Sequence, residues 1–104
     1  MFFKRRKDKS VDVKVIKNLI GKANLIDIRE PFEYKAGHIP STKNIPMEEL
    51  QLHPELYLDK NKEYYLICET GRRSLITTND LLKKGYKVIN VDGGTSRYQG
   101  KLDK

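Results

Sequence analysis

A single cysteine, Cys68, is the residue of this sequence best placed to do chemistry. It directly follows the run 64–67, whose aromatic and β-branched residues are typical of a central strand. In open α/β sheets, ligands bind beyond the carboxyl ends of the strands, so Cys68 stands where a nucleophile is expected. Taken without its neighbours, however, a lone cysteine at the end of an apolar strand is more often a buried apolar side chain.

The residues after Cys68 favour a negative charge on its sulfur. They are Glu69, Thr70, Gly71, Arg72, Arg73 and Ser74. Gly71 permits a tight turn, in which successive backbone N–H groups can point at an anion. The N-terminus of a following helix and the two arginines add positive potential, so a thiolate is favoured over a thiol. Such a thiolate can attack a sulfane sulfur, hold it as a persulfide and pass it to a second nucleophile.

The elements expected around this loop alternate between strands and helices, which is typical of βαβ units in a parallel sheet. The expected strands cover 23–28, 43–45, 62–68 and 86–91, and the expected helices cover 47–52 and 75–84. Pro31 can open a short helix and Gly37 can close it. Ser10 is a candidate N-cap for a helix over 15–20, and a short leading strand around Val11 is the alternative.

Length and composition indicate one small domain and exclude several classes of protein. The chain has 104 residues, which suits one domain. No apolar run approaches the roughly 20 residues that span a bilayer. The charged N-terminus has no apolar h-region behind it, so we expect no secretory signal peptide. One cysteine excludes an internal disulfide and fits a reducing compartment, so we expect a cytoplasmic protein.

The basic charge is concentrated at the N-terminus. The net charge is +7, of which residues 1–9 contribute +4. We therefore expect a basic tail over 1–10 followed by one domain over 11–104, with no specific nucleic-acid partner and no membrane partner.

Four segments, in this order, resemble the rhodanese family and in particular its single-domain members. They are Leu-Ile-Asp-Ile-Arg-Glu at 25–30, the stretch 33–46 with Gly-His-Ile-Pro, the Cys-x-x-Gly-x-Arg-Ser loop at 68–74, and Val-Asp-Gly-Gly at 91–94. The resemblance implies an α/β fold with a central, mostly parallel five-stranded sheet flanked by helices on both faces. It also implies a thiosulfate sulfurtransferase-like enzyme without a metal or organic cofactor.

The resemblance also implies roles for single residues. Cys68 matches the persulfide-forming nucleophile, and Arg73 matches the loop arginine that closes the sulfur site. Glu69, Thr70, Gly71, Arg72 and Ser74 match the loop that surrounds the bound sulfur. Asp27 and Arg29 match positions near the loop, where we expect an ion pair that holds the loop; a direct role in substrate binding is the alternative.

The two histidines and one aromatic residue are given structural roles. His38 matches a turn residue, with a role as a catalytic base as the alternative, and His53 matches a surface loop residue. Many members of the family carry Trp shortly after the Gly-Gly turn, where this chain offers Tyr98, which can cover the same apolar edge with less area.

Substrates and partners are predicted only by class. The donor is thiosulfate or a persulfide, the acceptor is cyanide or a thiol, and a sulfur-relay protein is a further candidate partner. The acidic Glu69 offsets part of the arginine charge, which favours a protein persulfide over a small anionic donor.

Three other functions are alternatives to sulfur transfer at this loop. Related phosphatases have five residues between Cys and Arg, whereas this loop has four, Glu69 to Arg72, which disfavours a phosphatase or arsenate reductase. A non-catalytic binding or regulatory module is the main alternative, although such modules usually lose the cysteine. A redox sensor that oxidises Cys68 to sulfenic acid is the third.

Overall fold

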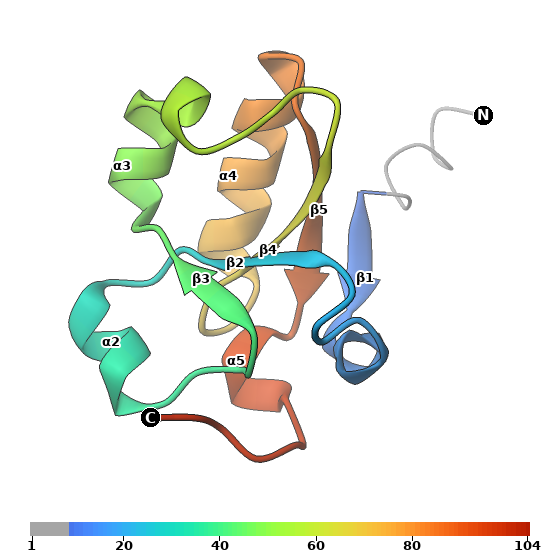
Figure 1. Ribbon diagram of the computed structural model, residues 1–104, viewed down its shortest axis with the longest axis vertical. Coiled ribbons are helices and arrows are strands. Elements are labelled where there is room, and N and C mark those ends of the chain that lie inside the picture. Colours follow the sequence, from blue (N-terminus) through green and yellow to red (C-terminus); the bar gives the residue numbers. More distant parts are fainter. Residues whose placement is uncertain (1–8) are drawn as a thin grey trace.

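A five-stranded parallel sheet forms the centre of the computed structural model, which describes residues 9–104 (Figure 1). The strands are β1 (Ser10–Asp12), β2 (Asn24–Asp27), β3 (Thr42–Asn44), β4 (Glu63–Ile67) and β5 (Lys87–Asp92). Their order in the sheet is β1-β5-β4-β2-β3, and every neighbouring pair is parallel. The carboxyl ends of β4, β2 and β5 therefore lie side by side at one edge of the sheet.

Short helices connect the strands. They are α2 (Pro31–Ala36), α3 (Met47–Leu52), α4 (Arg72–Lys83) and α5 (Gly94–Arg97), with 3₁₀ helices η1 (Val13–Asn18) and η2 (Pro54–Leu56). Figure 1 shows α3 and α4 beside each other, while η1 and α5 lie apart from them. Within residues 9–104, no helix is both long enough and apolar enough to cross a lipid bilayer.

Two apolar clusters, one on each face of the sheet, hold the layers together. Side chains alternate between the faces of a strand, so Leu66 packs in one cluster and Ile67 in the other. The first cluster joins the strands to α3 and α4 through Leu50 and Leu81, and the second includes Val13 and Ile16 of η1. This layering confirms the α/β fold with helices on both faces.

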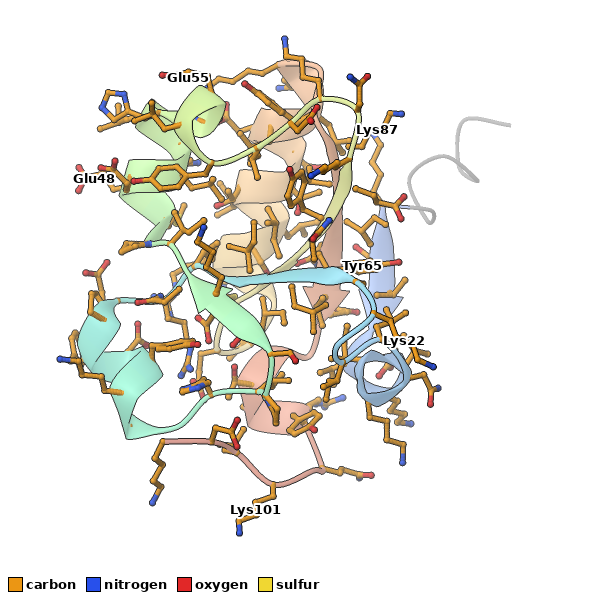
Figure 2. All side chains as sticks on the ribbon, in the orientation of Figure 1. Lys22, Glu48, Glu55, Tyr65, Lys87 and Lys101 are labelled. Atoms are coloured by element: carbon orange, nitrogen blue, oxygen red, sulfur yellow. The ribbon has the colours of Figure 1, made fainter. Side chains whose placement is uncertain are left out.

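Charged side chains cover the outside of these layers. Figure 2 shows Lys22, Glu48, Glu55, Lys87 and Lys101 pointing away from the ribbon, and all five are exposed. The segment 1–8, which carries most of the basic tail predicted over 1–10, lies outside the described residues.

The predicted N-cap at Ser10 is wrong. Ser10 is instead the first residue of β1, where it pairs with Asn90 of β5. Asp12 caps η1, because its Oδ1 accepts a hydrogen bond from the Lys14 backbone N–H at 2.9 Å. The alternative of a short strand around Val11 is confirmed, and the helix follows it at Val13.

The helix predicted over 75–84 begins earlier than expected, and two short helices, η2 and α5, were missed. Gly71 adopts a left-handed conformation with φ 96°, and α4 begins immediately after it at Arg72, so both loop arginines lie in its first turn. The Gly93-Gly94 turn leads into α5, a helix of four residues that the sequence patterns did not indicate.

Candidate active site

Cys68 lies just beyond the end of β4, on the face of the sheet that α4 covers. It belongs to the same apolar cluster as Leu66, two residues earlier, because alternate side chains share a face. Only 1% of Cys68 is exposed. Any negative charge on its sulfur must therefore be stabilised by the protein rather than by water.

Two backbone amides point at this sulfur. The Gly71 N–H donates to Sγ at 3.1 Å, and the Ser74 N–H donates at 3.3 Å. The Ser74 hydroxyl lies 3.3 Å from the same atom. The left-handed conformation of Gly71 bends the loop back toward Cys68, and a Cβ there would lie 2.9 Å from the backbone nitrogen of Gly93. Glycine is therefore required both for the turn and for its packing.

These donors stabilise a negative charge on the sulfur, although the side chain is buried. A hydrogen bond to a charged group contributes about 1.5–3 kcal/mol. Two of them offset a penalty of several kcal/mol for burying an ion. The donors around Sγ therefore favour a negative charge on the sulfur.

The turn before α5 supports the loop from behind. The backbone N–H groups of Thr95 and Ser96 donate to the carbonyl oxygens of Cys68 and Glu69, each at 2.9 Å. Gly94 lies so close to the loop that a Cβ would collide with both carbonyl oxygens. The Gly-Gly turn therefore fixes the backbone of the cysteine itself.

Arg73 is paired with a carboxylate that the sequence patterns did not indicate. Its two terminal nitrogens donate to Glu33 of α2, each at 3.0 Å. This hydrogen-bonded pairing raises the pKa of Arg73 and lowers the pKa of Glu33. An ionised Cys68 would act on the pKa of Arg73 in the same direction, after the larger effect of Glu33.

Asp27 and Arg29 form a buried ion pair that reaches the loop. Nε and Nη2 of Arg29 donate to the Asp27 carboxylate at 2.9–3.1 Å. Nη2 also donates to the Gly37 carbonyl at 2.8 Å, and Nη1 donates to Glu69 at 3.2 Å. Burial opposes the charge of Arg29, but its hydrogen bonds and the charges of Asp27 and Glu69 raise its pKa overall. The pair thus ties Glu69 to the end of β2.

The other predicted loop residues lie farther from the sulfur. Thr70 and Arg72 are exposed, and Glu69 turns toward Arg29. Among the described residues, Gly71 and Ser74 are the ones that hydrogen-bond to Sγ.

The histidines and Tyr98 occupy structural positions. The His38 ring stacks on Tyr34 at 3.7 Å between centroids, and its Nδ1 donates to the Tyr34 carbonyl at 2.8 Å. His53 is exposed at the end of α3. Tyr98 is partly buried against the cluster that contains Val13.

Asn90 was also missed by the sequence reasoning. Only 2% of it is exposed, and its Oδ1 accepts a hydrogen bond from the Ser74 hydroxyl at 2.5 Å. The available signal was an amide side chain within the otherwise apolar run 88–91, since buried polar groups need partners. Glu33 gave a weaker signal, because its place in the first turn of α2 is explained by capping alone.

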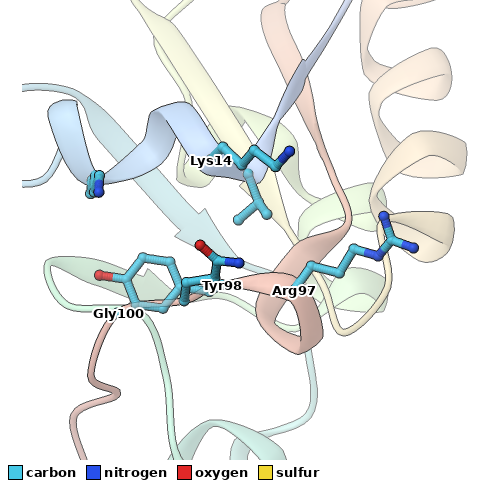
Figure 3. Close-up of a pocket in the computed structure, with 7 residues that line it drawn as sticks. Lys14, Arg97, Tyr98 and Gly100 are labelled. Carbon is cyan, nitrogen blue, oxygen red and sulfur yellow. The ribbon is translucent and has the colours of Figure 1, made fainter.

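A separate cavity of about 480 Å³ lies between η1 and the segment that follows α5 (Figure 3). Lys14, Lys17, Arg97 and Tyr98 are among its lining residues. None of the predicted site residues lines it, so it is distinct from the sulfur site.

Comparisons with known proteins agree with this geometry. The rhodanese-like domain model matches residues 12–101. YtwF of Bacillus subtilis, provisionally named a sulfurtransferase, is 41% identical over 76 residues, which cover 73% of each chain. YrkF of the same organism, provisionally named a sulfur carrier protein, is 40% identical over 81 residues, and the match covers 77% of this chain but only 43% of YrkF.

Solved structures match over nearly the whole chain. A rhodanese-like domain protein from Staphylococcus aureus has a TM-score of 0.80 and 30% identity, with 91% of this chain and 96% of that chain covered. SSP1007 from Staphylococcus saprophyticus has the same TM-score and 31% identity, with 92% and 99% covered. A sheet of this topology, a cysteine loop closed on backbone amides and these matches lead to one conclusion: the chain belongs to the rhodanese-like domain family.

Proposed function

We propose that this protein is a sulfurtransferase in which Cys68 carries a sulfane sulfur as a persulfide. The observation that supports the proposal most directly is the pair of amides of Gly71 and Ser74 at 3.1 and 3.3 Å from Sγ. They stabilise a negative sulfur whether it is the thiolate or, after small adjustments of the loop, the persulfide. Membership of the family and the provisional name of YtwF support the same activity.

The reaction proceeds in two displacements. In the first, the Cys68 thiolate attacks the outer sulfur of the donor and forms an S–S bond. With thiosulfate, the bond between the two donor sulfurs breaks and its electron pair leaves with sulfite. In the second, cyanide or a thiolate attacks the outer persulfide sulfur, and Cys68 is released as the thiolate. The Arg73 side chain, held by Glu33, contributes positive charge to both anionic steps.

The charges beside the loop support a proposal for the class of the sulfur donor. Glu69 is half-exposed and paired with Arg29, so one carboxylate stands at the surface next to the cysteine. A small dianion such as thiosulfate is repelled by it, whereas the persulfide group of a donor protein carries at most one negative charge. We therefore propose a persulfide as the preferred donor and a sulfur-relay protein as a partner.

Mass spectrometry of the intact protein tests the proposal. After incubation with thiosulfate or glutathione persulfide, the wild type should gain about 32 Da, the mass of one sulfur atom, and cyanide should remove it again. Cys68→Ser should keep its fold and gain nothing. Sulfur transfer by the Ser variant, or no adduct with either donor, would contradict the proposal.

One observation favours the alternative of a non-catalytic binding module, namely that only 1% of Cys68 is exposed. Alkylation separates the two functions. A catalytic thiol should react with iodoacetamide in the folded protein at mildly acidic pH, whereas a structural thiol should react only after denaturant is added.

A further inference from the structure

Asn90 connects the sulfur site to β1, the edge strand of the sheet. It lies in β5 between β4 and β1, and 2% of it is exposed. Its Oδ1 accepts the Ser74 hydroxyl at 2.5 Å, and its Nδ2 donates to the Ser10 hydroxyl of β1 at 3.4 Å. The amide is therefore held from both ends, with its oxygen directed at Ser74.

The Ser74 hydroxyl has one proton and two candidate acceptors. The Asn90 oxygen lies at 2.5 Å and the Cys68 sulfur at 3.3 Å. The shorter bond to oxygen is the stronger one, so the proton is donated to Asn90. The sulfur then keeps two backbone donors, while a third donor within reach is withheld from it.

We propose that Asn90 is a positioning residue that, by holding the Ser74 proton, sets the ionisation and the nucleophilicity of Cys68. The inference rests on the proposed sulfur transfer for its purpose. An additional hydrogen-bond donor makes the thiol ionise more readily. The resulting thiolate attacks more slowly, because its nucleophilicity falls as it is stabilised. Withholding the third donor keeps the sulfur reactive, and the two amides suffice to hold its charge.

Titration of the thiol tests this without any sulfur donor. The chain contains one cysteine, so ¹³Cβ-labelled cysteine gives a single NMR signal whose shift reports ionisation. Asn90→Leu removes the acceptor at similar volume and frees the Ser74 proton for the sulfur. The titration midpoint should fall by about one pH unit, a tenfold change in the thiolate-to-thiol ratio. The limiting rate of alkylation at high pH should fall about threefold.

The same substitution in a Ser74→Ala background separates this role from a merely structural one. Without the hydroxyl there is no proton to redirect, so Asn90→Leu should leave the midpoint of that variant unchanged. Asn24→Leu, on the exposed first residue of β2, is the control for an Asn→Leu change elsewhere in the sheet. An unchanged midpoint in the first variant, or an equal shift with and without Ser74, would overturn the inference.

Two further variants keep the test open if Asn90→Leu does not fold. Asn90→Ala removes the same acceptor and should lower the midpoint in the same way. Asn90→Asp keeps an acceptor and adds a negative charge, so its midpoint should rise, and a fall would contradict the role of Asn90. Because none of these measurements uses a persulfide, they remain decisive even if sulfur transfer itself is not observed.

Discussion

At the scale of single residues, the sulfur site combines burial with hydrogen bonding. Cys68 is as buried as the apolar side chains around it, and burial alone would make it an inert thiol. What distinguishes it is that the Gly71 and Ser74 amides are directed at Sγ. The same position fits a residue of the core and a nucleophile, and the two donors support the proposal that it is a nucleophile.

The Glu33–Arg73 pair gives a pH-dependent prediction. The hydrogen bonds from Arg73 lower the pKa of Glu33 in the folded protein below its ordinary value. The pair therefore adds stability above the ordinary range of a glutamate and loses it as pH falls through the lowered value. Because both side chains are partly exposed, solvent limits the contribution to less than about 1 kcal/mol.

Glu33→Gln should thus be less stable than the wild type at neutral pH by this small amount, and the difference should close at acidic pH, below the lowered pKa of Glu33. Persulfide formation should slow several-fold, because the Arg73 guanidinium is no longer held in position by the two hydrogen bonds to the Glu33 carboxylate. Urea unfolding at the two pH values and the rate of the 32 Da gain measure both effects, with Glu48→Gln on the exposed face of α3 as control. A stability difference that is the same at both pH values would rule out the charge pair as its cause.

At the scale of elements, the short helix α5 matters more than its length suggests. The backbone N–H groups of Thr95 and Ser96 donate to the carbonyl oxygens of Cys68 and Glu69, so α5 holds the backbone of the cysteine in place. Gly94 makes this possible, because it combines φ 57° with direct contact with those oxygens.

Gly94→Ala should therefore displace the cysteine loop. We expect a loss of about 1–3 kcal/mol in the free energy of unfolding and an almost complete loss of persulfide formation. Gly21→Ala is the matched control: Gly21 has φ 78° but no atom within 4 Å of the added Cβ. That control should lose about 1 kcal/mol through conformation alone and keep its activity. Equal losses of activity in the two variants would show that α5 does not position the loop.

At the scale of the whole molecule, the C-terminal segment closes the structure across the end that carries the site. Figure 1 shows it running past α5 to end beside α2. Asp103 and His38 exchange two backbone hydrogen bonds at 2.8 and 2.9 Å, and Leu102 lies against Gly37. The Gly37 carbonyl in turn accepts a hydrogen bond from Arg29, so the segment is linked to the ion pair that supports the loop.

Removing residues 101–104 should lower the free energy of unfolding by about 2 kcal/mol through the lost hydrogen bonds and the lost packing of Leu102. The Tm should fall by on the order of 10 °C. Lys101→Ala, which changes only an exposed side chain of the same segment, should leave the Tm nearly unchanged. A truncated protein with the wild-type Tm, measured by calorimetry, would show that the segment does not close the fold.

Local features of the chain were sufficient for most of the fold and for the centre of the site. The run before Cys68 indicated its strand, and Gly71 indicated the turn, because strand propensity and a left-handed glycine act over a few residues. Element ends were less accurate: α4 begins at Arg72, three residues before the predicted start, and tertiary packing stabilises a helix that contains the weak helix formers Thr77, Thr78 and Asn79.

The partners of the site residues depend on the assembled sheet. Glu33 and Arg73 are 40 residues apart, as are Arg29 and Glu69, while Asn90 meets Ser74 across 16 residues. Such contacts form because parallel strands end at a common edge, which brings together loops that are distant along the chain. The sequence alone indicates which residue can be the nucleophile. The charges and hydrogen-bond donors around that residue come from neighbours that meet only after folding.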